Sequence, residues 1–344
     1  MATETNSRAR EKIVRTPVTV VIPTHNRREH VLRILPVLRG QECSGDLDII
    51  VSCDRCTDGT KEAVQARFGT EVRVLDATAP GQTGACNTGA LAAREGILVF
   101  LDDDMEPRDG FLEAHLQAHL RHDGTPTAVI GYSQPVVSDH ATALQMRLAA
   151  ELEGFFQAMS EPTHQFSPMD LTGANFSLPR WLLLSLGGFN ETYTFQRNDF
   201  ELATRLMEAD VRFVFEISAH SLIHMDLEDD KMLARMPERA RNELRLLTEH
   251  PWCRAFLPFF TPGNERRLRR RLLWELAPMA APILDVLRKI APKNPMLLSL
   301  ACISRYTQEV RRQIGTWGSY DQLVRPAVPA IPICRHPKPA DEDP

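Results

Sequence analysis

The sequence contains no long apolar run. Its most hydrophobic late segment, residues 272–287, is interrupted by Glu275, Asp285 and prolines. A helix that crosses a bilayer needs about 20 consecutive apolar residues. The sequence therefore predicts no membrane-spanning helix.

An excess of positive charge is absent as well. The 344 residues carry a net charge of -5, and arginine greatly outnumbers lysine among the basic residues. Proteins that bind nucleic acids without sequence preference usually present a positive surface. The charge therefore argues against a nucleic-acid binder and favours small-molecule partners, while the preference for arginine is typical of a GC-rich, bacterial genome.

A secretory signal is also lacking, because residues 1–15 are polar and have no apolar core. The seven cysteines are an odd number spread over the whole chain, which is typical of reduced thiols in the cytoplasm. Cys53 and Cys56 form a CxxC pair, but no second pair stands at zinc-ribbon spacing, so we interpret both as loop thiols. We expect a cytoplasmic protein with a disordered lead-in at residues 1–16.

Short apolar runs alternate with helical patterns in the first third of the chain. Residues 18–22 and 49–52 have the composition of buried parallel strands. Between them, residues 28–39 place apolar side chains at helical spacing and end at Gly40. The alternation continues with a helix, a strand, a helix and a strand at residues 61–68, 72–75, 85–94 and 97–101.

This alternation predicts an α/β fold with a mostly parallel, Rossmann-like sheet flanked by helices. Ligands of such sheets bind beyond the carboxyl ends of the strands. The rule selects the polar residues that directly follow the predicted strands, namely Thr24, His25, Asn26, Asp54, Asp102, Asp103 and Asp104.

The second half of the chain changes in character. Strands are predicted at residues 128–133 and 212–215, with a long helix at 142–159 between them. Charged amphipathic helices follow from residue 231, and a proline-rich stretch ends the chain. We predict an α/β domain at residues 17–230, a helical C-terminal region at 231–325 and a disordered tail at 326–344.

Three consecutive carboxylates, Asp102, Asp103 and Asp104, follow the predicted strand at residues 97–101. They repel one another where charge is costly, so they need a compensating cation. Mg²⁺ or Mn²⁺, bound through one or two carboxylates plus water and diphosphate oxygens, meets that need. The alternative is a solvated acidic turn that caps the following helix.

Three further segments precede these aspartates: residues 20–27 (VVIPTHNR), 53–60 (CDRCTDGT) and 81–89 (GQTGACNTG). Together they resemble the donor-side segments of glycosyltransferase family 2, whose members have the GT-A fold. The resemblance implies that Asp54 contacts the nucleotide base and that Asn87 lines the donor pocket. The donor-binding residues predicted in this way are Pro23, Thr24, Asn26, Asp54, Asn87, Asp102 and Asp103.

The second half continues the resemblance, which covers about residues 17–225. Residues 173–177 (GANFS) and 187–191 (GGFNE) are similar to the acceptor-side segments of the family. Residues 198–202 (NDFEL) are similar to its Glu-Asp-x-Glu-Leu motif, with Asn198 in place of the first Glu. The resemblance implies that Asp102 and Asp104 form the metal-binding DxD pair, and that Asp199 is the catalytic base.

Two of the predicted site residues have a second interpretation. Asp199 would take the proton of the incoming hydroxyl, but an aspartate is also favoured in the first turn of a helix such as residues 199–209. His224 follows a strand where many relatives carry a histidine that faces the metal or the diphosphate. The competing interpretations are that His220 takes this role, or that His224 is purely structural.

A basic segment near the C-terminus is the one surface with a candidate partner of another kind. Five arginines between residues 266 and 271 precede Leu272, Leu273 and Trp274. A basic amphipathic helix of this type can lie on an anionic membrane. The alternative is a helix docked on the catalytic domain with a solvated face.

We therefore predict an inverting glycosyltransferase that uses a nucleotide diphosphate sugar, by resemblance a UDP-sugar, and Mg²⁺ or Mn²⁺. The acceptor class is open between a small molecule, a glycan, a lipid and a peptide. One alternative is a sugar-phosphate nucleotidyltransferase, but residues 23–26 stand where its Gly-rich phosphate loop would lie. The other is a degenerate, non-catalytic nucleotide-sugar-binding protein, which the substitutions at Cys53, Cys86 and Asn198 suggest.

Overall fold

The computed structural model describes residues 16–225, 229–257, 259–260, 264–291 and 294–324, without the side chains of residues 264–269. The disordered lead-in predicted for residues 1–16 and the disordered tail predicted for residues 326–344 lie outside the described residues, apart from Thr16. The described chain divides into two compact units. The first unit holds the residues up to Val136 and Leu152–His224, and the second holds Val137–Glu151 and the residues from Met225 onward.

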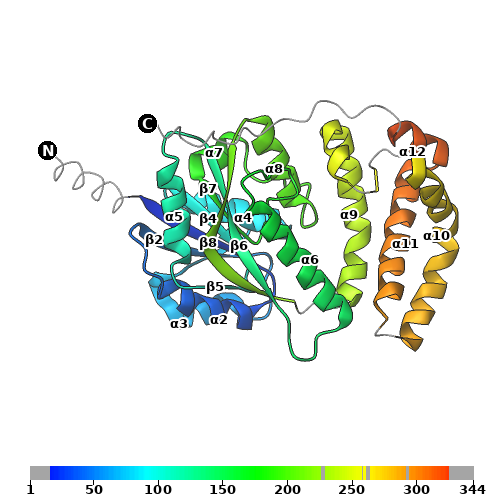
Figure 1. Cartoon of the computed structure of the whole chain (residues 1–344). Coiled ribbons are helices and arrows are strands. Elements are labelled where there is room, and N and C mark those ends of the chain that lie inside the picture. The colour runs from blue at the N-terminus through cyan, green and yellow to red at the C-terminus, as the bar shows by residue number, and fades with distance from the viewer. Residues whose placement is uncertain (1–15, 226–228, 258, 261–263, 292–293, 325–344) are drawn as a thin grey trace. The chain divides into compact units, whose positions relative to one another are not determined.

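A mixed sheet of eight strands forms the centre of the first unit (Figure 1), in the order β3-β2-β1-β4-β7-β6-β8-β5. The half formed by β3, β2, β1 and β4 is parallel, as the alternation in the sequence predicts. β7 runs antiparallel to β4 and β6, and β5 runs antiparallel to β8, so the whole sheet is mixed. The strands are β1 (Pro17–Thr24), β2 (Asp46–Cys53), β3 (Arg73–Asp76), β4 (Ile97–Leu101), β5 (Met105–Pro107), β6 (Thr127–Val136), β7 (Asn175–Pro179) and β8 (Arg212–His224).

The helices of this unit follow the strands closely. Their observed ends differ from the predicted ends by a few residues, the largest change being the start of α4 at Gly81. They are α2 (Arg28–Arg39), α3 (Thr60–Phe68), η1 (Gly69–Glu71), α4 (Gly81–Ala92), α5 (Phe111–Arg121), α7 (Arg180–Ser185), α8 (Asn198–Glu208) and the later turns of α6 (Ala143–Met159).

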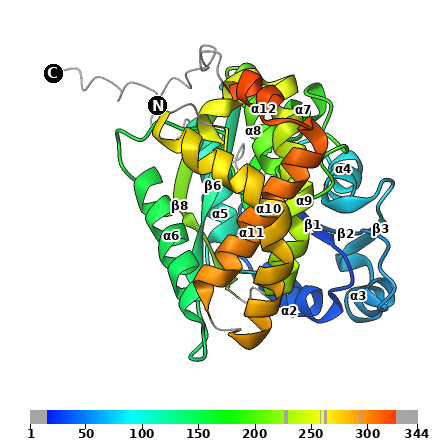
Figure 2. The same cartoon turned by 90° about the vertical axis from the view of Figure 1, so that its right-hand side faces the viewer.

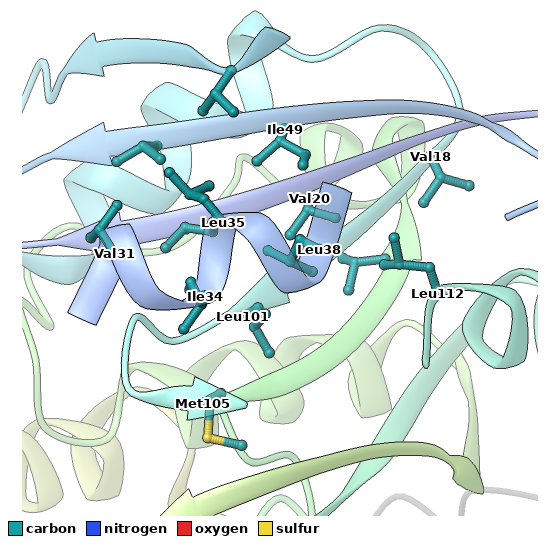
Figure 3. Packing of buried hydrophobic residues seen from close by; sticks show 14 of the residues in the cluster. Val18, Val20, Val31, Ile34, Leu35, Leu38, Ile49, Leu101, Met105 and Leu112 are labelled. Carbon is teal, nitrogen blue, oxygen red and sulfur yellow. The ribbon is translucent and has the colours of Figure 1, made fainter. Parts of the chain in front are cut away.

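Helices cover both faces of the parallel half. Leu35 of α2 lies with Val20 and Ile49 of β1 and β2 in one cluster of buried side chains (Figure 3). On the opposite face, α4 lies so close to β1 that a Cβ on Gly89 would be 2.3 Å from Val21 Cγ1. Because both faces are covered, the strand ends are the parts of this sheet at which polar ligands can bind.

β7 carries two buried polar side chains whose partners are histidines one turn apart on α5. His115 Nε2 lies 2.9 Å from Asn175 Oδ1, and Ser177 Oγ lies 2.8 Å from both His115 Nδ1 and His119 Nε2. With a proton on each Nε2 and the Ser177 hydroxyl donating to His115, every one of these bonds is satisfied. Burial lowers the pKa of His115 to about 4 and that of His119 to about 3, so both histidines are neutral.

The second unit is helical in its described residues. α9 and α11 share an apolar core with the first turns of α6, formed around Leu144, Leu233 and Leu298. Every helix in the described ranges is too short or too polar to cross a membrane. The elements from Met225 onward are α9 (Asp229–Glu249), η2 (Pro251–Phe256), α10 (Asn264–Ile290), α11 (Pro295–Ile314) and α12 (Trp317–Val324).

Candidate active site

The predicted site residues of the first half gather at one edge of the sheet. β1, β2 and β4 are parallel neighbours, and their register places Thr24 beside Cys53. The backbone N–H of Asp54 donates to Thr24 O over 2.8 Å, which fixes the turn after β2 against the end of β1. Asp102 follows directly on β4 at the same edge. The fold therefore brings Thr24, Asp54 and the three aspartates into one region, as strand polarity predicts.

Arg27 is the cation that the protein itself supplies to the aspartates. Its Nη1 donates to Asp103 Oδ1 over 2.8 Å and to Asp104 Oδ2 over 2.6 Å. Thr24 Oγ1 donates to the other oxygen of Asp103 over 2.6 Å, so both oxygens of this buried carboxylate are bonded. Partial burial opposes the charge of Arg27, but the two aspartates outweigh it and raise the pKa of the guanidinium. Both oxygens of Asp103 are thus bonded inside the protein, while Asp104 accepts a hydrogen bond from the described residues at only one of its two oxygens.

Asp102 has no cation of its own. Its Oδ1 accepts from Gln82 Nε2 over 2.8 Å, and no donor in the described part of the chain contacts its Oδ2. Desolvation raises the pKa of Asp102 well above its ordinary value, and the charges of Asp104, Asp103 and Asp199 add to this against Arg27. One arginine therefore faces a group of carboxylates whose charge it does not balance.

This donor set suits a hard divalent cation. Asp102 Oδ2 and Asp104 Oδ1 are carboxylate oxygens that no described donor contacts, and oxygen is the ligand that Mg²⁺ and Mn²⁺ prefer. Over the described residues, no three His, Cys, Asp or Glu side chains converge as a preformed metal cluster. The edge thus fits a cation held by one or two carboxylates with its other positions open to ligand oxygens.

Asp199 lies within electrostatic range of this group. It stands in the first turn of α8, where Phe200 N–H donates to its Oδ1 over 2.7 Å and Gly173 N–H to its Oδ2 over 3.2 Å. A Cβ on Gly173 would lie 3.4 Å from Asp199 Cβ, which is close contact. Each carboxylate oxygen keeps a further lone pair, so the group can still accept a proton.

Gln82 and Asn198 join α8 to the aspartates. Asn198 Nδ2 donates to Gln82 Oε1 over 3.2 Å, and Gln82 in turn donates to Asp102. An amide at position 198 can both donate to Gln82 and accept from a neighbour, which a Glu carboxylate cannot do. Asn198 therefore links α8 to Asp102 through Gln82.

Asp54 has one buried oxygen without a protein partner. Gly81 N–H donates to Asp54 Oδ2 over 3.0 Å, whereas Asp54 Oδ1 is buried and contacts no donor in the described residues. A buried, unsatisfied carboxylate oxygen is costly unless a ligand supplies the donor. Asn26, with φ +52°, accepts the Thr57 N–H over 2.7 Å and so holds the turn that carries Asp54. Pro23 is buried within β1 and contributes only backbone and ring surface.

Asn87 contacts the loop that follows α7. Its Oδ1 accepts from Phe189 N–H over 2.8 Å, and its Nδ2 donates to Phe189 O and to Glu191, each over 2.9 Å. Gly188 has φ +78°, and a Cβ there would lie 2.6 Å from Asn87 Oδ1. The polar atoms of Asn87 are thus occupied by this loop, and its predicted contact with a donor stays a prediction.

His224 is the last residue of β8, which corrects the expectation that it follows a strand ending at Phe215. Its Nε2 lies 3.4 Å from Glu106 Oε2, and its neighbour Ile223 pairs with Met105, one residue beyond Asp104. His220, the competing candidate, contacts Gln134 Oε1 over 3.0 Å. The register places His224 near the aspartates, and its role as a metal ligand stays a prediction.

A separate hollow lies near the amino end of β2. It is lined by Gln41, Ser44, Asp109 and Glu113, among others. Glu113 accepts from the backbone and hydroxyl of Ser44 within it. None of the predicted site residues lines this hollow.

Comparisons with known proteins agree with this arrangement. Residues 19–177 match the family model described as glycosyl transferase family 2. A pre-mycofactocin glycosyltransferase of Mycobacterium tuberculosis (strain ATCC 25618 / H37Rv) is 31% identical over 208 residues, which are 58% of this chain and 41% of that protein. The chain thus spans about two fifths of the length of that relative. An uncharacterized glycosyltransferase of Bacillus subtilis (strain 168), EpsJ, is 24% identical over 324 residues, covering 92% of this chain and 87% of EpsJ.

One solved structure shares the architecture. The mannosyltransferase PcManGT from Pyrobaculum calidifontis, solved in complex with GDP-Man and Mn²⁺, aligns with a TM-score of 0.55 at 18% identity over 87% of both chains. This similarity shows the fold, and the predicted GT-A architecture with its C-terminal helices is confirmed.

Proposed function

The chain belongs to glycosyltransferase family 2, and on that premise we propose that it transfers a sugar from a nucleoside diphosphate sugar to a hydroxyl of an acceptor, with inversion at the anomeric carbon. The observation that carries this proposal is the group of carboxylates beyond β4. Asp102, Asp103 and Asp104 face one arginine, and desolvation raises the pKa of Asp102.

The proposed cation is Mg²⁺ or Mn²⁺, held by Asp102 and Asp104, with His224 as a further candidate ligand. When bound, it supplies positive charge beside the diphosphate that leaves the sugar. Arg27 already contacts Asp104 and adds a second positive charge at this edge. Gln82 Nε2 donates to Asp102 Oδ1, which leaves Asp102 Oδ2 without a donor among the described residues.

Asp199 is the proposed general base. Two backbone N–H groups donate to its carboxylate and fix its position in the first turn of α8. An acceptor hydroxyl within hydrogen-bond reach would pass its proton to Asp199 as the oxygen attacks the anomeric carbon. Attack from the face opposite the diphosphate inverts that carbon.

Asp54 is the proposed contact for the nucleotide base. Its buried, unpartnered Oδ1 calls for an N–H donor. The imide N–H of uracil supplies one, which supports a UDP-sugar. Guanine offers an N–H of the same kind, and PcManGT was solved with GDP-Man, so the donor panel includes both nucleotides.

The acceptor and the place of action are part of the same proposal. The net charge of -5 argues against nucleic acid. The six cysteines in the described ranges are free thiols, which supports a reducing compartment such as the cytoplasm. The acceptor would be a glycan, lipid, peptide or small molecule that offers a nucleophilic hydroxyl.

The test is a panel of UDP- and GDP-sugars incubated with the full chain, followed by mass spectrometry of the released nucleotide. We expect slow hydrolysis of at least one sugar nucleotide with Mn²⁺, and none with chelator. Formation of a sugar nucleotide from a nucleoside triphosphate and a sugar phosphate would instead identify a nucleotidyltransferase. No turnover with any donor, together with unchanged nucleotide binding in chelator, would favour the non-catalytic alternative.

A further inference from the structure

α10 carries a continuous apolar stripe on its exposed side. We use the name apolar stripe for Leu272, Leu276, Met279, Ile283, Val286 and Ile290. Their exposed fractions lie between 50% and 74%. The spacing of four, three, four, three and four residues keeps all six on one side of a helix with 3.6 residues per turn. Large side chains this exposed, in an unbroken row, are unusual for a protein surface that faces only water.

The opposite side of α10 is packed, so the stripe is not the side by which the helix joins its unit. Trp274 and Ala277 are buried. Arg311 of α11 donates to the carbonyl oxygen of Trp274 over 2.8 Å, and Ser304 of α11 donates to that of Ala277 over 2.9 Å. Figure 2 shows α10 and α11 side by side within the helical unit. Trp274, which follows the five arginines in the sequence, therefore lies in the core of the helical unit.

α11 widens the exposed apolar surface. Met296, Leu300 and Ile303 repeat the same helical spacing on it and are 40% to 65% exposed. Leu298 and Ala301, on another side of α11, lie in the core shared with α9. Both helices thus turn one side inward and leave a second apolar side outside.

The charges along α10 are mainly positive. Its 27 residues include seven Arg and Lys and three Asp and Glu, a net charge of +4. Of these cations Arg270 is buried, and Arg288 is paired with Asp229 and Asp230 of α9. Asp285 is paired with Arg305 over 2.9 Å, and Glu275 lies 3.8 Å from Arg311. Arg271 and Lys289 are exposed, one at each end of the apolar stripe. The surface therefore combines an apolar row with positive ends.

We propose that the apolar stripe of α10 binds the surface of a lipid bilayer with anionic headgroups, with the helix lying parallel to the membrane plane. Apolar side chains along one helix side would enter the boundary between headgroups and acyl chains, while Arg271 and Lys289 reach the headgroup phosphates. A second copy of the chain fits the stripe less well. Protein interfaces are enriched in aromatic residues and depleted in Lys, whereas the stripe has no aromatic residue and ends beside Lys289.

The experiment is flotation of the full chain with vesicles of phosphatidylcholine, with or without phosphatidylglycerol. We expect flotation with the mixed vesicles and much less with phosphatidylcholine alone. Ile283→Glu places a charge in the middle of the stripe and should weaken binding by about tenfold or more, because one buried Ile side chain is worth at least that factor. A wild-type protein that stays at the bottom with both vesicle types overturns the proposal.

Ile217→Glu is the matched control. Ile217 of β8 and Ile283 are both 58% exposed, so the two variants make the same chemical change on surfaces of equal exposure. Binding should persist in Ile217→Glu, and equal loss in both variants would show that the stripe has no special role. Circular dichroism of both variants checks that they are folded.

Two further measurements test the role of the charged residues and the alternative that the stripe binds a second copy of the chain. Arg271→Glu combined with Lys289→Glu should remove the preference for phosphatidylglycerol, and an unchanged preference contradicts the proposed role of these charges. Light scattering without vesicles should show that the wild type is no larger than Ile283→Glu. A wild-type dimer that Ile283→Glu dissociates would instead assign the surface to a second copy. Because no sugar nucleotide is used, these results stand independently of the proposed transferase activity.

Discussion

Two carboxylates, Glu243 in the helical unit and Asp102 in the first unit, lie in contrasting electrostatic surroundings. In the helical unit, Glu243 accepts from Arg239 Nε over 2.8 Å and from the hydroxyl of Tyr306, so its charge is balanced on the spot. Beyond β4, Asp102 accepts from the neutral amide of Gln82 and has no cation of its own. The first arrangement pairs the charge within the protein, whereas the second leaves Asp102 without a cation of its own and with a raised pKa.

The largest effect should come from removing the charge at Asp199. Asp199→Asn keeps the shape of the side chain but cannot accept the proton, so kcat should fall by about 10²–10⁴-fold. Nucleotide affinity should change little, because the donor-side residues are untouched. Steady-state kinetics and calorimetry on the same preparation measure both quantities.

The matched control for this variant lies at the other end of α8. Asp210 is exposed and has φ +55°, a conformation that Asn tolerates well. Asp210→Asn should retain wild-type kcat. If Asp199→Asn retains it too, Asp199 is an ordinary first-turn aspartate and not the base.

The paired carboxylate of the helical unit should affect stability instead. Glu243→Gln removes the counter-charge of Arg239, whose side chain is 36% exposed, and should lower the free energy of unfolding by about 1–2 kcal/mol. Urea unfolding measures this change. Glu249→Gln, an exposed position on the same helix, should change stability by less than about 0.5 kcal/mol. A small effect at Glu243 would mean that the pair contributes no more than a surface contact.

Neutral buried histidines extend the comparison to pH. Burial lowers the pKa of His115 to about 4 and of His119 to about 3, while an unfolded histidine titrates near about 6.5. The unfolded state therefore binds more protons between these values, and stability falls as pH drops below about 6.5. At pH 5 the loss should be about 2 kcal/mol for each histidine.

Urea unfolding at neutral pH and at pH 5 measures this loss. The double variant His115→Gln and His119→Gln lacks both titrating groups, so its stability should depend less steeply on pH. The same steepness in the variant and the wild type would place the acid sensitivity elsewhere in the protein.

The smallest effect concerns the uncompensated carboxylate. Asp102→Asn removes a charge that the folded protein disfavours, so in chelator the variant should be as stable as the wild type or more stable by about 1 kcal/mol. Adding Mn²⁺ and UDP should raise the melting temperature of the wild type and leave that of Asp102→Asn unchanged. A clear loss of stability in chelator would show that Asp102 is balanced by the protein after all.

The parallel half of the fold follows from the sequence because its strands are short apolar runs between helical patterns. β7 was not predicted as a strand, because the polar residues Asn175 and Ser177 occupy buried positions in it. Their partners, His115 and His119, lie some 60 residues earlier and four residues apart on α5. Only the tertiary structure shows that these polar groups satisfy one another.

The site itself was predictable in part. Strand polarity places Thr24, Asp54 and the three aspartates at one edge, and the sequence pattern alone indicates this. The roles of Arg27 and Gln82 were missed, although Arg27 stands only three residues beyond the end of β1. Long flexible side chains can reach several neighbours, so their partners follow from packing and not from their position in a motif.

The most direct test of a cation site beyond β4 is calorimetry of UDP with the wild type and with Asp104→Asn, each in Mn²⁺ and in chelator. The wild type should bind UDP at least about tenfold more tightly in Mn²⁺, and Asp104→Asn should lose this difference. Equal binding of a nucleoside diphosphate in Mn²⁺ and in chelator would contradict a cation held by these aspartates.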